Sequence, residues 1–269
     1  VNQSEKNATA VKFKLNFKKA FKLTNAVLYN VDAKVSLNDL QVEIEKLKSV
    51  KYVSFNRVYR KQSLDPDFEK QWYLDNTGQS IQWFSGTSGI DIGWLDALDL
   101  YQKKERSFVA VFDSGFAKDH DELDTKNAYI IPERDGNVGV DDDGNGYVDD
   151  INGWDFVNND NQPEDGNGHG THVSGTIAAV RNNALGIAGV ADNVKIMPLR
   201  FLNSSGNGYI SNAISALNYA ITNGAPISNN SWGGGGYSSS LHTVIGAANQ
   251  AGHTFVAAAG NSGQNIDTN

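Results

Sequence analysis

The sequence contains no cysteine among its 269 residues. This absence excludes disulfide bonds, a thiol nucleophile and any metal site built from thiolate ligands. Long apolar runs are missing as well, and none approaches the roughly 18 residues that a membrane-spanning helix requires. Lys and Arg residues are fewer than Asp and Glu residues, 23 against 31. The resulting net charge of −8 argues against nucleic acid or an anionic membrane as the main partner. We therefore expect neither nucleic acid nor a membrane among the partners of this chain.

The positive charges that are present gather at one end of the chain. Residues 1–61 hold 13 Lys and Arg against 5 Asp and Glu, whereas residues 62–269 hold 10 against 26. A reversal of charge sign on this scale indicates a domain boundary, and it falls near Lys61, just before Asp65 and Pro66. We expect a first domain at residues 1–63 and a second domain at residues 64–269.

The first domain is expected to be a small α+β unit. Residues 36–50 have the spacing of an amphipathic helix with Ser36 as its N-cap, and residues 51–60 are strand-like. Its positive charge beside an acidic neighbour permits two interpretations. It is either an independent basic domain or a segment that docks on the second domain.

The second domain alternates between strand-like and helix-like segments. Helices are expected from residue 169, over 210–224 and over 238–252, and strands at 108–112, 194–201, 226–232 and 254–261. This alternation predicts an α/β fold with a mostly parallel sheet covered by helices on both faces. Functional sites of such sheets form at the carboxyl ends of strands, where Asp113, Ser231 and Asn261 stand.

Two histidines, His169 and His172, stand three residues apart in the segment GHGTHVSGTIAA. On a helix this spacing lets both rings face the same way. The pair suits two zinc ligands, and it equally suits one catalytic base beside one packed histidine. A zinc site would need a third ligand, and the sequence has neither an HExxH motif nor a cysteine to supply it.

Four motifs in a fixed order carry a resemblance to a known family. They are VAVFDSG at 109–115, GHGTHVSGTIAA at 168–179, NNSWGG at 229–234 and VAAAGNSG at 256–263. In this order they resemble the subtilisin-like serine proteases over about residues 64–263, and the segment before them resembles the pro-segment of that family. The resemblance implies a peptidase that is secreted or exposed at the cell surface.

The resemblance also assigns roles that match the chemistry of peptide hydrolysis. That reaction needs a nucleophile, a base, a carboxylate that orients the base, and donors for the oxyanion. By resemblance His169 is the base, Asp113 the orienting carboxylate and Asn261 the side-chain oxyanion donor, while His172 is structural. From the residues alone, Asp113 and Asn261 are equally compatible with turn positions.

The nucleophile of the family does not occur in its usual place. Its serine follows the oxyanion asparagine in a Gly-Thr-Ser-Met-Ala-type segment, and no residue after Asn261 fits that pattern. Ser88, in GTSG, precedes Asp113 and so contradicts the Asp-His-Ser order of the family. We therefore expect either a fragment whose serine is supplied by a complementary C-terminal fragment or an inert relative that only binds peptides.

Substrate contacts follow from the same resemblance. The segment Ser231, Trp232, Gly233 and Gly234 resembles the edge on which an extended peptide adds as a strand. By resemblance Ala258, Ala259 and Gly260 form the opposite wall of the main specificity pocket. Tyr209 resembles the aromatic wall of a more distant subsite, although an ordinary glycine-rich loop is the alternative. We expect the main specificity pocket to prefer apolar or large side chains of the substrate.

Calcium is the cofactor we expect, because it would replace the missing disulfide bonds. The segment at 141–147 fits the first half of a calcium loop, with oxygen ligands at alternate positions and a glycine at the bend: Asp141, Asp143, Asn145, Gly146 and Tyr147. Position twelve is Asn152 rather than Glu, so Asp149 or Asp150 would have to replace it. The alternative is a solvated acidic hairpin.

A second calcium site is implied by the resemblance alone. The loop NNALGIAGV would contribute Asn183 and the carbonyl groups of Leu185 and Ile187, with Asp65 and Glu122 as carboxylate ligands. The family usually has Asp at the position of Glu122. In the family that the chain resembles, the tail of the pro-segment lies in the substrate cleft until it is cut. Because the nucleophile is missing here, we expect the junction at 61–68 to stay uncleaved and the basic first domain to stay docked on the acidic body.

Overall fold

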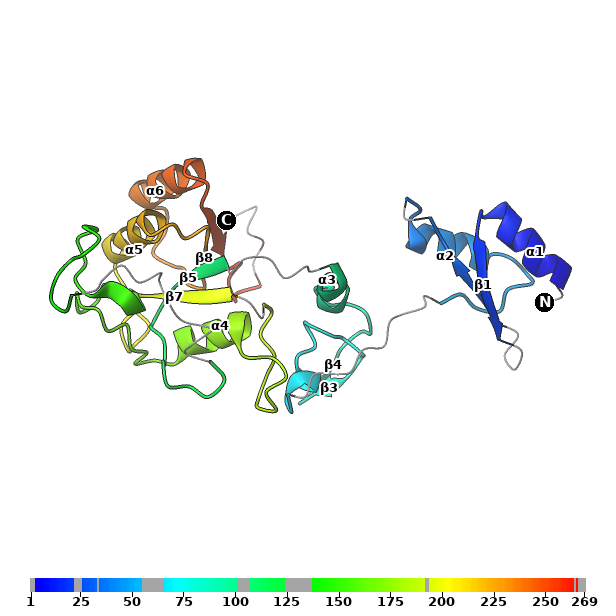
Figure 1. Ribbon diagram of the computed structural model, residues 1–269, viewed down its shortest axis with the longest axis horizontal. Helices are drawn as coiled ribbons and strands as arrows, with labels where there is room; N and C mark the ends of the chain where they lie inside the picture. Colours follow the sequence, from blue (N-terminus) through cyan, green and yellow to red (C-terminus); the bar gives the residue numbers. More distant parts are fainter. Residues whose placement is uncertain are drawn as a thin grey trace. The chain divides into compact units, whose positions relative to one another are not determined.

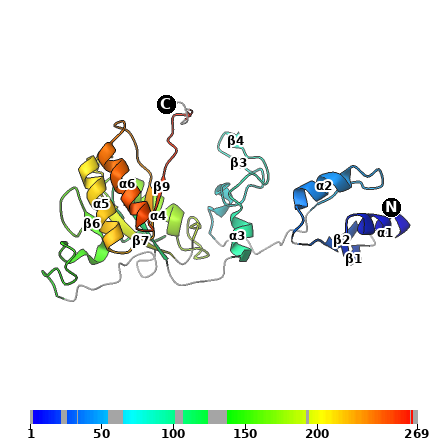
Figure 2. The same cartoon turned by 90° about the horizontal axis from the view of Figure 1, so that it is seen from above.

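The computed structural model describes residues 3–21, 26–32, 34–54, 65–100, 107–123, 137–191, 194–263 and 265. The chain divides into two compact units, Val1–Gln62 and Ser63–Asn269 (Figures 1 and 2). The junction expected near Lys61 lies outside the described residues. Within the described residues, no helix is long and apolar enough to cross a membrane.

The N-terminal unit combines two helices with a two-stranded antiparallel sheet. Its elements are α1 (Gln3–Lys12), β1 (Asn16–Phe21), β2 (Ala26–Asn30) and α2 (Leu37–Glu45). Helix α2 begins as the sequence predicts, because the Ser36 side chain accepts a hydrogen bond from the backbone N–H of Asp39. The strand expected at 51–60 is wrong for residues 51–54, and residues 55–60 are not described. The backbone of Val53 bonds instead to the side chains of Gln41 and Glu45 on α2.

The second unit contains a five-stranded parallel sheet. Its strands stand in the order β6-β7-β5-β8-β9. They are β5 (Ser107–Asp113), β6 (Trp154–Asp155), β7 (Val194–Arg200), β8 (Ile227–Asn230) and β9 (Thr254–Ala257). Strands β5 and β7 pair over their full length, from Ser107 opposite Val194 to Asp113 opposite Arg200. All the strands run the same way, so their carboxyl ends meet at one edge of the sheet.

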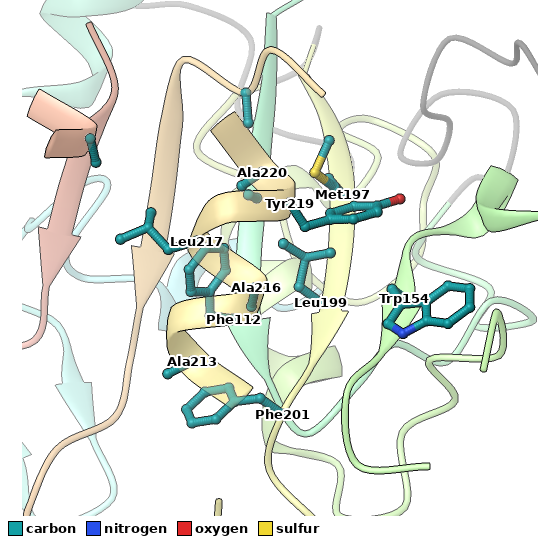
Figure 3. Close-up of a cluster of buried hydrophobic side chains, with 13 residues drawn as sticks. Phe112, Trp154, Met197, Leu199, Phe201, Ala213, Ala216, Leu217, Tyr219 and Ala220 are labelled. Carbon is teal, nitrogen blue, oxygen red and sulfur yellow. The ribbon is translucent and has the colours of Figure 1, made fainter. Parts of the chain in front are cut away.

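Helices cover both faces of this sheet, which confirms the predicted fold class. Side chains alternate between faces along a strand, and β5 shows it: Ala110 and Phe112 belong to one core cluster and Val111 to another. The first cluster joins the sheet to α5 (Ile210–Thr222) and to Ala248 of α6 (Ser239–Gln250), as Figure 3 shows for α5. The second cluster joins it to Ala178 of α4 (His169–Ala178).

Residues 65–100 form a cap of short elements that periodicity does not predict. They are η1 (Phe68–Lys70), the hairpin of β3 (Ser80–Ile81) and β4 (Phe84–Ser85), and α3 (Trp94–Leu100). Phe68, Leu74 and Trp94 form a small core with Ala188. The Gln71 amide bonds to both backbone groups of Ala188, which fixes the cap to the 182–190 loop.

Candidate active site

An aspartate and a histidine meet at the carboxyl edge of the sheet. Asp113, the last residue of β5, is buried, and His169, the first residue of α4, is exposed over about half of its side chain. The Nδ1 atom of His169 lies 2.7 Å from Oδ1 of Asp113. A carboxylate acceptor at this distance favours the tautomer with the proton on Nδ1, which leaves Nε2 free to accept a proton.

Glycines allow α4 to begin so close to β5. Gly168 precedes the helix with a φ of +96°, a conformation that glycine adopts without strain. A Cβ atom at Gly170 would lie 2.2 Å from the carbonyl oxygen of Gly115, so only glycine fits there. His172 is exposed in the same helix, and only His169 reaches Asp113.

Two polar residues that the sequence analysis did not identify, Ser114 and Asp165, support the pair. The Ser114 backbone N–H donates to Oδ1 of Asp113 at 2.7 Å, and the Ser114 hydroxyl donates to Oδ1 of Asp165 at 2.8 Å. Burial alone would raise the pKa of Asp165, but hydrogen bonds from Thr171, Gly168 and Asn167 outweigh it and lower the pKa to about 2. The sequence signal that could have identified Asp165 is an acidic residue just before a helix start, because carboxylates there accept the N–H groups that have no partner within the helix.

A groove with a volume of about 470 Å³ opens beside His169. One wall is the segment predicted to bind substrate, Ser231 to Gly234, and it continues through Gly235 and Gly236. Another part of the lining is apolar and comes from the residues directly after β7, from α5 and from α6: Phe201, Leu202, Ile210, Ala213 and Leu241. Tyr209 is the N-cap residue of α5, is highly exposed and does not line this groove.

The segment with the expected oxyanion donor lies beyond the sheet. Strand β9 ends at Ala257, four residues before Asn261, so the expectation that the strand reaches Asn261 is wrong. The backbone N–H of Ala258 still donates to Asn230, and Gly260 then turns the chain with a φ of +89°. Ala258, Ala259, Gly260 and Asn261 are exposed and do not line the groove. Ser88 is also exposed and away from the groove lining.

The acidic loop expected to hold calcium is tightly folded. Asp141 accepts hydrogen bonds from the backbone N–H groups of Gly144, Asn145 and Gly146, and Asn145 accepts one from Tyr147. The Asn145 amide nitrogen lies 3.2 Å from Oδ2 of Asp143 and 2.9 Å from Oδ2 of Asp150. Two carboxylates therefore converge on one amide donor, and the carboxylate and amide oxygens gathered in this loop are of the types that calcium binds.

The two candidates for the closing carboxylate of this loop differ in their contacts. Asp149 accepts from the backbone of Gly139 through both carboxylate oxygens. Asp150 accepts a hydrogen bond from the same Asn145 amide nitrogen as Asp143 does. It also accepts one from the hydroxyl of Tyr219 at 2.5 Å. Burial and the bond to Asp150 raise the pKa of Tyr219 well above its ordinary value. Asp150, which contacts the same group as Asp143, is thus better placed than Asp149 to be the closing carboxylate of this loop.

The second expected calcium site contains a buried carboxylate. Neither oxygen of Glu122 meets hydrogen-bond geometry with a described group, although the Asn183 side chain and the Ile187 backbone lie near enough to lower its pKa. Burial outweighs them and raises the pKa of Glu122. Asp65 accepts the N–H groups of Asn182 and Asn183, and Asn183 accepts that of Leu185. A buried carboxylate beside amide and carbonyl oxygens fits a calcium ion.

Among the described residues, no three histidine or acidic side chains stand together as a ready metal cluster. Both candidate loops would complete their ligand sets with amide and carbonyl oxygens. That composition suits calcium better than a transition metal.

A parallel α/β sheet that presents a His–Asp pair beside a glycine-walled groove is the framework of a hydrolase with a triad-type site. The sequence profile of the subtilase family, Peptidase_S8, matches residues 104–269. The chain therefore belongs to the subtilase family of serine proteases.

Individual relatives are similar over parts of their length. "Subtilisin-like protease 1" of Plasmodium berghei is 29% identical over 234 residues, which are 86% of this chain and 38% of that protein. "Thermitase" of Thermoactinomyces vulgaris is 44% identical over 113 residues, 42% of this chain and 40% of that protein. The chain thus spans less than half of these relatives. A solved structure titled "Crystal structure of a cold adapted subtilisin-like serine proteinase" is 27% identical, with a TM-score of 0.43 over 71% of this chain and 56% of that chain.

Proposed function

We propose that this chain is the base-bearing part of a calcium-stabilised serine endopeptidase, together with its pro-segment. The observation that carries the proposal is the 2.7 Å contact between His169 and Asp113 at the mouth of the groove. In this role Nε2 of His169 takes the proton of a serine hydroxyl and later returns it to the leaving amine. Asp113 holds the Nδ1–H tautomer and stabilises the imidazolium that forms.

The groove would hold the polypeptide substrate in an extended form. Gly233 and Gly234 carry no side chains, so a peptide backbone can approach and pair with the Ser231 to Gly234 edge. The apolar lining favours apolar or large side chains of the substrate. Asn261, with Ala258 to Gly260 beside it, would supply the amide donor for the oxyanion once it is brought to the groove.

The serine itself is proposed to come from a complementary C-terminal segment that this sequence does not include. A fluorophosphonate reagent tests this, because it labels only activated serines. The isolated chain should remain unlabelled, and a protein extended through a Gly-Thr-Ser-Met-Ala-like segment should be labelled. His169→Ala should abolish that labelling, and Ser88→Ala should leave it unchanged. Labelling of the isolated chain that Ser88→Ala removes would overturn the assignment.

A peptide-binding relative without activity is the second candidate, favoured by the glycine-rich wall of the groove, which could hold a peptide whether or not a nucleophile is present. Both candidates keep the groove, so binding of a peptide does not separate them. Labelling of the extended protein does, because an inert relative would remain unlabelled with or without His169.

Calcium would serve stability rather than the reaction. Asp141, Asp143, Asn145, the carbonyl of Tyr147 and either Asp149 or Asp150 would hold one ion. Asp65, Glu122, Asn183 and the carbonyls of Leu185 and Ile187 would hold another. The buried oxygens of Glu122 support the second site most directly. Burial outweighs the nearby Asn183 side chain and Ile187 backbone and raises the pKa of Glu122, and a buried carboxylate is costly unless a cation accompanies it. We also propose a secreted or cell-surface location, where free calcium is plentiful and can stabilise a chain that has no disulfide bonds.

Residues 1–61 are proposed to act as a pro-segment that inhibits the complete enzyme. Their excess of positive charge and the acidic composition of the body favour association, which charge steering would accelerate. Added as a separate peptide, residues 1–61 should inhibit the extended protein, with an association rate that falls as salt rises. A peptide that neither binds nor inhibits at low salt would make residues 1–61 an unrelated domain.

A further inference from the structure

Asp165 lies four residues before His169 and is half-buried. Its Oδ1 atom accepts hydrogen bonds from the Ser114 hydroxyl at 2.8 Å and from the N–H groups of Asn167 and Gly168 at 2.9 and 2.8 Å. Its Oδ2 atom accepts the N–H and the hydroxyl of Thr171 at 2.9 and 2.6 Å. Five donors use essentially the whole acceptor capacity of one carboxylate.

Ser114 connects this carboxylate to the catalytic pair. Its N–H donates to the same Asp113 oxygen that meets His169, and its hydroxyl accepts the N–H of Gly170 at 3.0 Å. The other oxygen of Asp113, Oδ2, is buried with no hydrogen-bond partner among the described residues. The position of Oδ1 relative to the imidazole therefore depends on Ser114, and Ser114 is held by Asp165.

We propose that Asp165 is a positioning residue, which fixes the first turn of α4 to the end of β5 and so keeps Nδ1 of His169 on Asp113. The ring of contacts runs from Asp113 through Ser114 and Asp165 to Gly168 and Thr171, on both sides of His169. The role of this ring in catalysis rests on the proposed function, but the position of His169 relative to Asp113, which the ring maintains, is a property of this chain.

The charge of Asp165 suits this task. Its pKa of about 2 keeps the carboxylate ionised at neutral and moderately acidic pH. An anion at a helix N-terminus satisfies N–H groups that have no partner within the helix and interacts favourably with the helix dipole. The neighbouring Glu164 lacks this role, because it pairs with Lys118 at 2.8 Å and both side chains are half-exposed.

Nitrogen-15 and proton NMR of this chain labelled at histidine tests the proposal without any need for activity. The wild type should show His169 as the Nδ1–H tautomer with a downfield, slowly exchanging Nδ1 proton, assigned by its loss in His169→Gln. Asp165→Asn keeps the size of the side chain but replaces one acceptor oxygen with a donor. It should abolish the Nδ1 proton signal and populate the Nε2–H tautomer. Glu164→Gln, which removes the same charge one residue away, should leave both unchanged.

An Asp165→Asn protein that melts as a folded chain yet keeps the wild-type tautomer and proton signal would overturn the proposal. If Asp165→Asn does not fold, Ser114→Ala and Thr171→Val test the proposal instead, because neither changes the charge. Ser114→Ala removes the hydroxyl bonds to Asp165 and Gly170, and Thr171→Val removes those to Asp165 and Ala117. Both should weaken the Nδ1 proton signal, and unchanged signals in both would also overturn the proposal.

Activity provides a separate readout in the extended protein. Asp165→Asn should lower kcat by up to about 10²-fold with KM nearly unchanged, because a small displacement of the base leaves the groove wall intact. An extended protein with no activity would contradict the proposed function, and the NMR result would stand independently of it.

Discussion

Gly170 packs so closely on Gly115 that a Cβ atom at position 170 would lie 2.2 Å from the Gly115 carbonyl oxygen and 3.1 Å from Cβ of Asp113. Backbone atoms at this distance cannot move aside as a flexible side chain can. The contact brings the N-terminal turn of α4 against the end of β5, and it leaves His169 next to Asp113. A residue without a side chain, next to His169 in the sequence, thus sets the distance within the pair.

The close packing of Gly170 predicts opposite effects for two glycines of one helix. Gly170→Ala should destabilise the fold by about 1–3 kcal/mol and weaken the His169–Asp113 contact, because α4 must shift away from β5. Gly175→Ala is the matched control, since a Cβ atom there meets nothing within 4 Å. It should stabilise the helix by about 0.5–1 kcal/mol. Thermal melts check both, and a neutral Gly170→Ala would contradict the prediction.

Asp165 predicts a defined pH dependence of stability. Its pKa is lowered from 3.8 to about 2 in the folded chain, so its contribution is fully present above pH 3.8 and is lost as the pH falls toward 2. Asp165→Asn should therefore be less stable than the wild type at neutral pH, and the difference should shrink between pH 4 and pH 2. Denaturant melts at several pH values measure it. A difference that stays constant over this range would show that the charge of Asp165 contributes nothing.

The sequence predicts the α/β fold well because its signals are local. Helix α5 has a continuous apolar stripe and ends before Gly224, and β5 is an apolar run, so periodicity is sufficient to place both. Strand β6 has only two residues, and its pairing of Trp154 with Leu199 exists only in the folded sheet. The β3–β4 hairpin is equally short, and no pattern of that length stands out in a sequence.

The site was predicted in part, and for a different reason. Family motifs pointed to Asp113 and His169 although 56 residues separate them, and the structure brings them together. Nothing in the motifs marked Asp165 or Ser114, because the bond between them spans 51 residues and depends on how α4 meets β5. The motifs placed Asn261 at a strand end, whereas Gly260 turns the chain away after β9.

Glu122 predicts a stability effect that changes sign with calcium. In chelator, Glu122→Gln should raise the melting temperature, because it replaces a carboxylate whose charged form burial disfavours, despite the nearby Asn183 side chain and Ile187 backbone, with a neutral amide. In excess calcium the order should reverse, since the wild type gains stability from a ligand that binds only the folded state. Asp121→Asn, at an exposed carboxylate next to Glu122, should change neither melt. The same order of melting temperatures in both conditions would argue against a cation at Glu122.

The acidic loop predicts a calcium site that an aromatic cluster can report. The Tyr147 ring packs on Trp154 and Tyr219 with centroid distances of 4.9 and 4.8 Å, and Tyr147 follows Asn145 within the loop. A terbium ion bound in place of calcium should therefore be excited through these rings, and its emission should fall as calcium displaces it. Asp143→Asn should remove the emission, because Asp143 and Asp150 converge on Asn145.

Asp142→Asn is the matched control for Asp143→Asn. The Asp142 carboxylate accepts from the backbone and side chain of Asn137 instead, so this variant should retain the emission. Equal emission from the two variants would place the terbium ion elsewhere, and the acidic loop would then be a solvated hairpin.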